Sequence, residues 1–132
     1  EADELLMVAR QMNPGEPEYM LLEARRLLMV EDLGNAEKLV NECLALIKGD
    51  SNLTHLFAQA YIVQSDIYVA AKDYSTAISI RENLSNAGLR SKELDLQLYD
   101  VYVKAGRLKD AKSYLATFQD ILSKEELAAL EQ

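Results

Sequence analysis

The chain has 132 residues, of which 49% are hydrophobic and 27% are charged. This composition excludes a disordered tail and fits one folded domain with a modest core. The net charge of −8 argues against nucleic-acid binding and against anionic membrane surfaces, because phosphate groups are bound mainly by Lys and Arg. No apolar run approaches the roughly 18 residues that a membrane-spanning helix needs. A soluble protein is expected, and both cytoplasmic and periplasmic locations stay open.

With only 5 Gly and 2 Pro, the chain favours helices throughout, and short segments alone interrupt the helical periodicity. The first helix ends before the sequence NPGEP at 13–17, because Pro cannot continue a helix. Ser51 or Asn52 is expected to cap the fourth helix, and Ser123 with Glu126 forms a predicted capping box for the last one. The expected helices cover residues 2–12, 18–30, 35–47, 53–71, 74–86, 92–105 and 108–122, followed by a short helix from 123.

Two passages that lie 34 residues apart carry the same pattern. Residues 68–77 read YVAAKDYSTA and residues 102–111 read YVKAGRLKDA. An aromatic residue, Val, Ala, a turn, a large residue and a small Ala recur at matching offsets. A period of this size is typical of arrays of helical hairpins, in which each hairpin buries its apolar face only against its neighbours.

The chain resembles the tetratricopeptide repeat family over nearly its whole length, with degenerate repeats. In the best-matched repeat the pattern falls on Leu98, Tyr99, Tyr102, Gly106, Ala111, Leu115 and Phe118. One repeat earlier it falls on Tyr61, Ser65, Tyr68, Ala77 and Leu84, and before that on Met20, Ala24, Leu27, Gly34, Ala36, Val40 and Cys43. Trp is absent, Gln64 and Arg81 replace expected apolar residues, Tyr99 is oversized for a small position, and about seven residues are inserted near 49–55.

The resemblance implies an all-α fold: a right-handed helical-hairpin solenoid of about three and a half repeats with a C-terminal capping helix. Another kind of helical-hairpin solenoid is the alternative. The expected units form a single domain over 1–132, namely a half repeat at 1–14, repeats at 17–50, 58–90 and 91–122, and a capping helix at 123–132.

In this family the first helix of each repeat lines a concave groove that binds a peptide or a partner helix. The resemblance places in the groove Leu21, Arg25, Leu28, Met29, Ile62, Asp66, Val69, Leu96, Asp100 and Val103. This apolar stripe with acidic edges is expected to suit a protein or peptide partner with aliphatic and basic residues. The alternative is that the apolar members are ordinary packing residues and that the acids are solvated.

Two family functions fit poorly. The carboxylate clamp that holds chaperone C-termini needs Lys, Asn and Arg on this face, where Arg25 alone is suitable and two acids would repel a carboxylate. Residues 102–107 also resemble the pentatricopeptide family, which reads single-stranded RNA, but the acidic charge and the few basic residues on the first-helix face oppose it.

No arrangement of residues in the sequence indicates catalysis, a cofactor or a metal site. His55 is the only histidine and Cys43 the only cysteine, and they belong to different predicted hairpins, so a Cys–His pair is not expected. No phosphate-binding Gly-rich loop is present. The sequence therefore predicts a non-catalytic protein–protein interaction module.

The alternative function is a structural or assembly role. Leu5, Leu6 and Val8 give the N-terminal half repeat an apolar surface, whereas terminal repeats usually have a polar outer face. In that role the chain stacks on flanking repeats of a longer protein or self-associates as a homo-oligomer. For the groove itself, Ile62 and Leu96 are the expected partner anchors.

Overall fold

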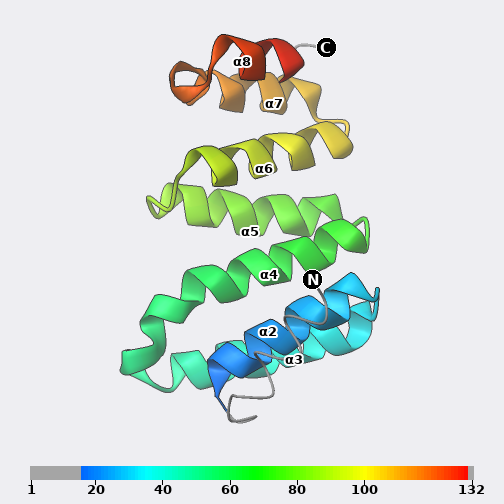
Figure 1. Ribbon diagram of the computed structural model, residues 1–132, viewed down its shortest axis with the longest axis vertical. Coiled ribbons are helices and arrows are strands. Elements are labelled where there is room, and N and C mark those ends of the chain that lie inside the picture. Colours follow the sequence, from blue (N-terminus) through cyan, green and yellow to red (C-terminus); the bar gives the residue numbers. More distant parts are fainter. Residues whose placement is uncertain (1–15, 131–132) are drawn as a thin grey trace.

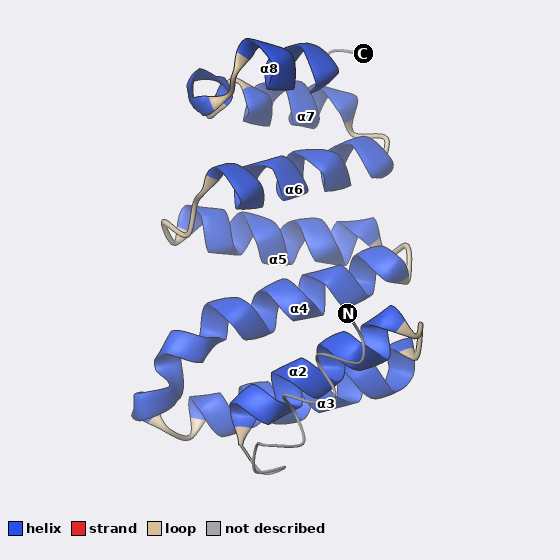
Figure 2. Ribbon diagram, viewed as in Figure 1, coloured by secondary structure: helices blue, strands red, loops and turns tan. Residues whose placement is uncertain are grey.

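The structure is a computed structural model that describes residues 16–130, in which every regular element is a helix (Figures 1 and 2). The expected half repeat at 1–14 lies outside the described residues. The elements are α2 (Pro17–Met29), α3 (Leu33–Lys48), the 3₁₀ helix η1 (Ser51–Leu56), α4 (Phe57–Ala70), α5 (Tyr74–Asn86), α6 (Lys92–Lys104), α7 (Leu108–Leu115), the 3₁₀ helix η2 (Gln119–Ile121) and α8 (Lys124–Leu130). The all-α prediction is confirmed.

From α2 to α7, consecutive helices pack on one another in chain order, and α2 also contacts α4. Figure 1 shows the resulting stack, with α2 and α3 at one end and α8 at the other. Within residues 16–130, no helix is long and apolar enough to cross a membrane.

Three turns inside the hairpins repeat one backbone geometry. Glu31, Lys72 and Gly106 have φ values of 62°, 63° and 76°. In each turn the next residue's N–H donates to a carbonyl five residues earlier at 2.9 Å, as Arg107 does to Tyr102. This is the Schellman arrangement that ends helices with a left-handed residue, which Gly adopts without strain. Lys72 and Gly106 are 34 residues apart, so the sequence repeat coincides with a repeat of turn geometry.

Two helix boundaries differ from the prediction by more than two residues. The expected helix at 53–71 begins as the 3₁₀ helix η1, and Asp50 rather than Ser51 or Asn52 provides the cap, because its side chain accepts from the N–H of Asn52. The expected helix at 108–122 ends at Leu115. The predicted capping box is confirmed: the Ser123 N–H donates to Glu126 Oε1 at 3.0 Å, and the Glu126 N–H donates to Ser123 Oγ at 3.1 Å.

Small residues lie where helices approach one another, as expected. Ala24, Ala36, Ser65, Ala77 and Ala111 are all at most 1% exposed. Such residues let helix backbones come close, and larger side chains fill the space beside them. Tyr99, oversized for its position, is accommodated because it is only half-buried, and its hydroxyl donates to the carbonyl of Leu130 in α8.

The buried side chains form two main clusters. The N-terminal cluster spans α2 to α4 and includes Val40, Ile47 and Ile67, and the C-terminal cluster spans α5 to α7 and includes Ile78 and Leu98. Each cluster is therefore made by helices that are neighbours along the chain.

Candidate functional site

The ten predicted groove residues lie on α2, α4 and α6. The structure shows these positions in three different surroundings. An opening lies between α2 and the start of α4, the gap between α4 and α6 is filled, and a second opening lies between α6, α7 and α8.

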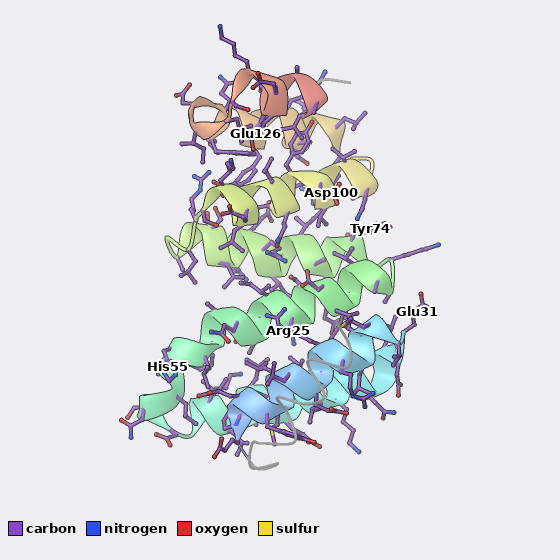
Figure 3. The ribbon with its side chains drawn as sticks, in the orientation of Figure 1. Arg25, Glu31, His55, Tyr74, Asp100 and Glu126 are labelled. Atoms are coloured by element: carbon purple, nitrogen blue, oxygen red, sulfur yellow. The ribbon has the colours of Figure 1, made fainter. Side chains whose placement is uncertain are left out.

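The first opening is a depression of about 470 Å³ that combines apolar and polar side chains. Its lining consists of Glu18, Leu21, Leu22 and Arg25 of α2, His55 and Leu56 of η1, and Gln59 of α4. Figure 3 shows Arg25 between α2 and α4, and His55 where the chain turns into α4. His55, at the end of the stretch inserted near 49–55, thus lines the opening.

Arg25 supplies the positive charge of the first opening from α2. It takes part in no ion pair within residues 16–130. Its neighbour Arg26 is paired with Glu23. The described residues thus leave the Arg25 guanidinium as a hydrogen-bond donor for a bound group.

Arg81 of α5 fills the gap between α4 and α6. Its side chain is 4% exposed, its Nε donates to Ser65 Oγ at 2.7 Å, and its Nη2 lies 2.8 Å from Asp66 Oδ1. Asp66, expected as an acidic edge of the groove, is thus paired with Arg81, and its side chain is 39% exposed. Ile62 and Val69, its neighbours on α4, are half-buried.

The second opening is a depression of about 810 Å³ and is mostly apolar. Three predicted groove residues, Leu96, Asp100 and Val103, line it from α6. The others are Tyr99 of α6, Leu108, Ala111, Lys112 and Leu115 of α7, and Ala129 and Leu130 of α8. Asp100 is exposed, and the Lys104 ammonium lies 2.9 Å from its carboxylate.

The remaining predicted groove residues lie on α2. Leu21 is only 3% exposed and belongs to the N-terminal cluster, so it forms the floor of the first opening and is mainly a core residue. Leu28 is half-buried and packs against the same cluster, whereas Met29 is 46% exposed. The ten predicted residues therefore do not line one continuous groove.

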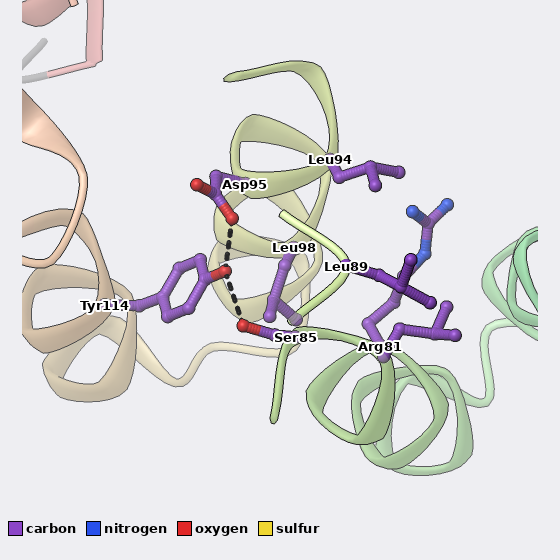
Figure 4. A pocket seen from close by; sticks show the side chains of 8 residues that line it. Arg81, Ser85, Leu89, Leu94, Asp95, Leu98 and Tyr114 are labelled. Atoms are coloured by element: carbon purple, nitrogen blue, oxygen red, sulfur yellow. Dashed lines mark hydrogen bonds between the residues drawn. The ribbon is translucent and has the colours of Figure 1, made fainter. Parts of the chain in front are cut away.

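Sequence reasoning missed a polar cluster that joins α5, α6 and α7 (Figure 4). Asp95, 3% exposed, accepts from the Tyr114 hydroxyl at 2.6 Å and from Arg90 Nε at 3.2 Å. The Tyr114 hydroxyl also lies 3.2 Å from Ser85 Oγ. The cavity beside this cluster is only about 10 Å³, room for a single water. Its role is therefore to hold the helices together.

Burial raises the pKa of three tyrosines, Tyr68, Tyr102 and Tyr114, and hydrogen bonds to Glu37, Glu82 and Asp95 add to the effect. A raised folded-state pKa gives stability that is complete below the unfolded pKa of about 10 and is lost as the pH rises above it. The fold is therefore expected to weaken in alkaline solution.

The pH dependence of unfolding tests this expectation. For Tyr102, whose side chain is 5% exposed, one pH unit above 10 should cost about 1 kcal/mol. Urea unfolding at neutral pH and near pH 11 should show a smaller alkaline loss in Tyr102→Phe than in the wild type. An equal loss in both proteins would contradict the assignment.

No protein family, curated protein or solved structure matches this chain. Within residues 16–130, no group of three or more His, Cys, Asp or Glu side chains could hold a metal ion. Cys43 is buried and His55 is exposed. The proposal about function below therefore rests on the residues that line the two openings.

Proposed function

We propose that this chain is a non-catalytic protein–protein interaction module, built as a right-handed solenoid of tetratricopeptide-like hairpins, that binds a peptide in the first opening. The observation that carries the proposal is Arg25, which takes part in no ion pair within residues 16–130 and lies beside Leu22 and Gln59 in a depression between α2 and α4. Hairpin turns of the same geometry and the buried small residues support the repeat architecture.

The lining of the first opening defines the chemistry of the partner. Leu22 is half-buried and offers an apolar surface for an aliphatic side chain. Arg25 donates to peptide carbonyl or carboxylate groups, and Gln59 can donate or accept. Glu18 at the rim is suited to a Lys or Arg of the peptide, and the net charge of −8 favours encounter with basic partners.

Selection of peptides from a random displayed library against the purified full chain tests the proposal. The selected peptides are expected to combine aliphatic with basic residues. Leu22→Asp should weaken their binding at least ten-fold, because a charge in an apolar contact is left without a partner (about 1.4 kcal/mol or more). Arg25→Ala should weaken binding several-fold through loss of a charged hydrogen-bond donor.

Leu46→Asp is the matched control, because Leu46 is 43% exposed on α3 and does not line the first opening. The affinity of Leu46→Asp for the selected peptides should equal that of the wild type. If no peptide is selected, or if Leu22→Asp binds as well as Leu46→Asp, the first opening is not the binding site.

A further inference from the structure

The second opening corresponds to a surface that is covered in the preceding hairpin. Tyr74, Ala77 and Ile78 of α5, with Val69 of α4, pack against α6 in the C-terminal cluster. Adding the repeat length of 34 to these four positions gives Leu108, Ala111, Lys112 and Val103, and all four line the second opening. The same part of the repeat is thus covered by α6 in one hairpin and open in the next.

The helix that takes the place of α6 in the last hairpin is α8. Both helices begin after a capping serine, Ser91 or Ser123, and by this alignment Leu98 corresponds to Leu130. In α6 the contacts continue beyond Leu98 through Val101, Tyr102 and Ala105.

The exposed side chains of the second opening are those that the second half of such a helix would cover. Val103 is 39% exposed and Leu108 is 57% exposed. Large apolar side chains that are exposed next to one another mark an interaction surface. The expected occupant is an amphipathic helix with the spacing of Leu98, Val101, Tyr102 and Ala105.

We propose that residues 2–12 of a second copy of this chain occupy the second opening. Leu5, Val8, Ala9 and Met12 have the same spacing as the four α6 residues, and the sequence predicts a helix at 2–12. That segment lies outside the described residues. Its own α2 is at the other end of the stack from α8 (Figure 1), and the proposal therefore assigns the contact to two copies.

The charges of the two surfaces are complementary. Residues 1–12 carry three acids and one base, whereas residues 104–112, which border the second opening, carry four bases and one acid. Lys112 lines the opening and takes part in no ion pair within the described part of the chain. Attraction between Lys112 and Asp3 or Glu4 of the second copy favours binding of residues 2–12 at the second opening over contact between two acidic surfaces.

Sedimentation equilibrium of the full chain tests the inference. The mean mass is expected to rise with protein concentration, because a small interface of this kind gives reversible association. Leu108→Asp in the acceptor surface and Val8→Asp in the donor segment should each give a monomer at every concentration. Ile121→Asp is the matched control, because Ile121 is 55% exposed outside the second opening, and it should associate like the wild type.

Mixing the two monomeric variants gives the decisive result. The Leu108→Asp chain keeps its donor segment and the Val8→Asp chain keeps its acceptor surface, so the mixture should form a one-to-one complex. A monomeric wild type, a mixture that stays monomeric, or a loss of association in Ile121→Asp would each overturn the proposal. Circular dichroism of each variant confirms that its helices are retained. Because Leu108 lines the second opening and not the first, the outcome for Leu108→Asp does not depend on peptide binding in the first opening.

Discussion

Asp66→Ala is expected to lower the free energy of unfolding by about 2 kcal/mol, because it leaves the buried Arg81 guanidinium without its ion-pair partner, while water screens part of the interaction at the 39% exposed Asp66 side chain. Arg81 is 4% exposed, and its Nη1 has no hydrogen-bond partner within residues 16–130. Removing Asp66 leaves Ser65 as the partner of this side chain. Urea unfolding of the wild type and the variant measures the difference.

Two further variants make the test specific. Asp100→Ala removes the acid at the equivalent position 34 residues later, which is 58% exposed and paired with Lys104 on the surface. That change should cost less than about 1 kcal/mol. Adding Arg81→Leu to Asp66→Ala should recover part of the lost stability, because an apolar side chain needs no ionic partner. Equal costs at Asp66 and Asp100 would show that burial of Arg81 does not strengthen its ion pair with Asp66.

Leu98→Ala is expected to cost about 3 kcal/mol, because Leu98 is 1% exposed and its loss leaves a cavity in the C-terminal cluster. Since contacts in this stack are made between neighbouring helices, the effect should be local. In Leu98→Ala, hydrogen exchange should become faster than in the wild type in α5, α6 and α7, and it should change little in α2 and α3.

Ile47→Ala is the counterpart in the N-terminal cluster, where Ile47 is also 1% exposed. It should produce the opposite pattern, with exchange accelerated in α2, α3 and α4. If both variants accelerate exchange equally along the whole chain, the two clusters unfold as one cooperative unit and the local interpretation fails.

Most of the helical structure follows from local sequence. The helix expected at 74–86 is found at those residues, and the expected capping box at Ser123 and Glu126 forms. Periodicity, caps and turns involve residues only a few positions apart, and such patterns can be read directly. The prediction failed near 53 and 115 because apolar periodicity alone does not distinguish a continuing α-helix from a 3₁₀ segment or from an end imposed by packing.

The candidate site was less predictable than the helices. Arg25, Leu96, Asp100 and Val103, which the family pattern placed in the groove, line openings in the structure. The ion pair of Asp66 could not be read from the pattern, because the partner of that side chain is 15 residues away on another helix. An Arg at an expected apolar position was the available signal for this pair.

The sequence by itself determined that the described chain is helical, where its hairpin turns lie, and which small residues lie at helix crossings, because these properties depend on neighbouring residues and on a fixed period. Only the tertiary structure decided which charges are paired, which apolar side chains stay exposed, and where the stack is open. Those outcomes depend on contacts between helices, such as the one that brings Arg81 to Asp66 while leaving Arg25 without an ion pair within residues 16–130.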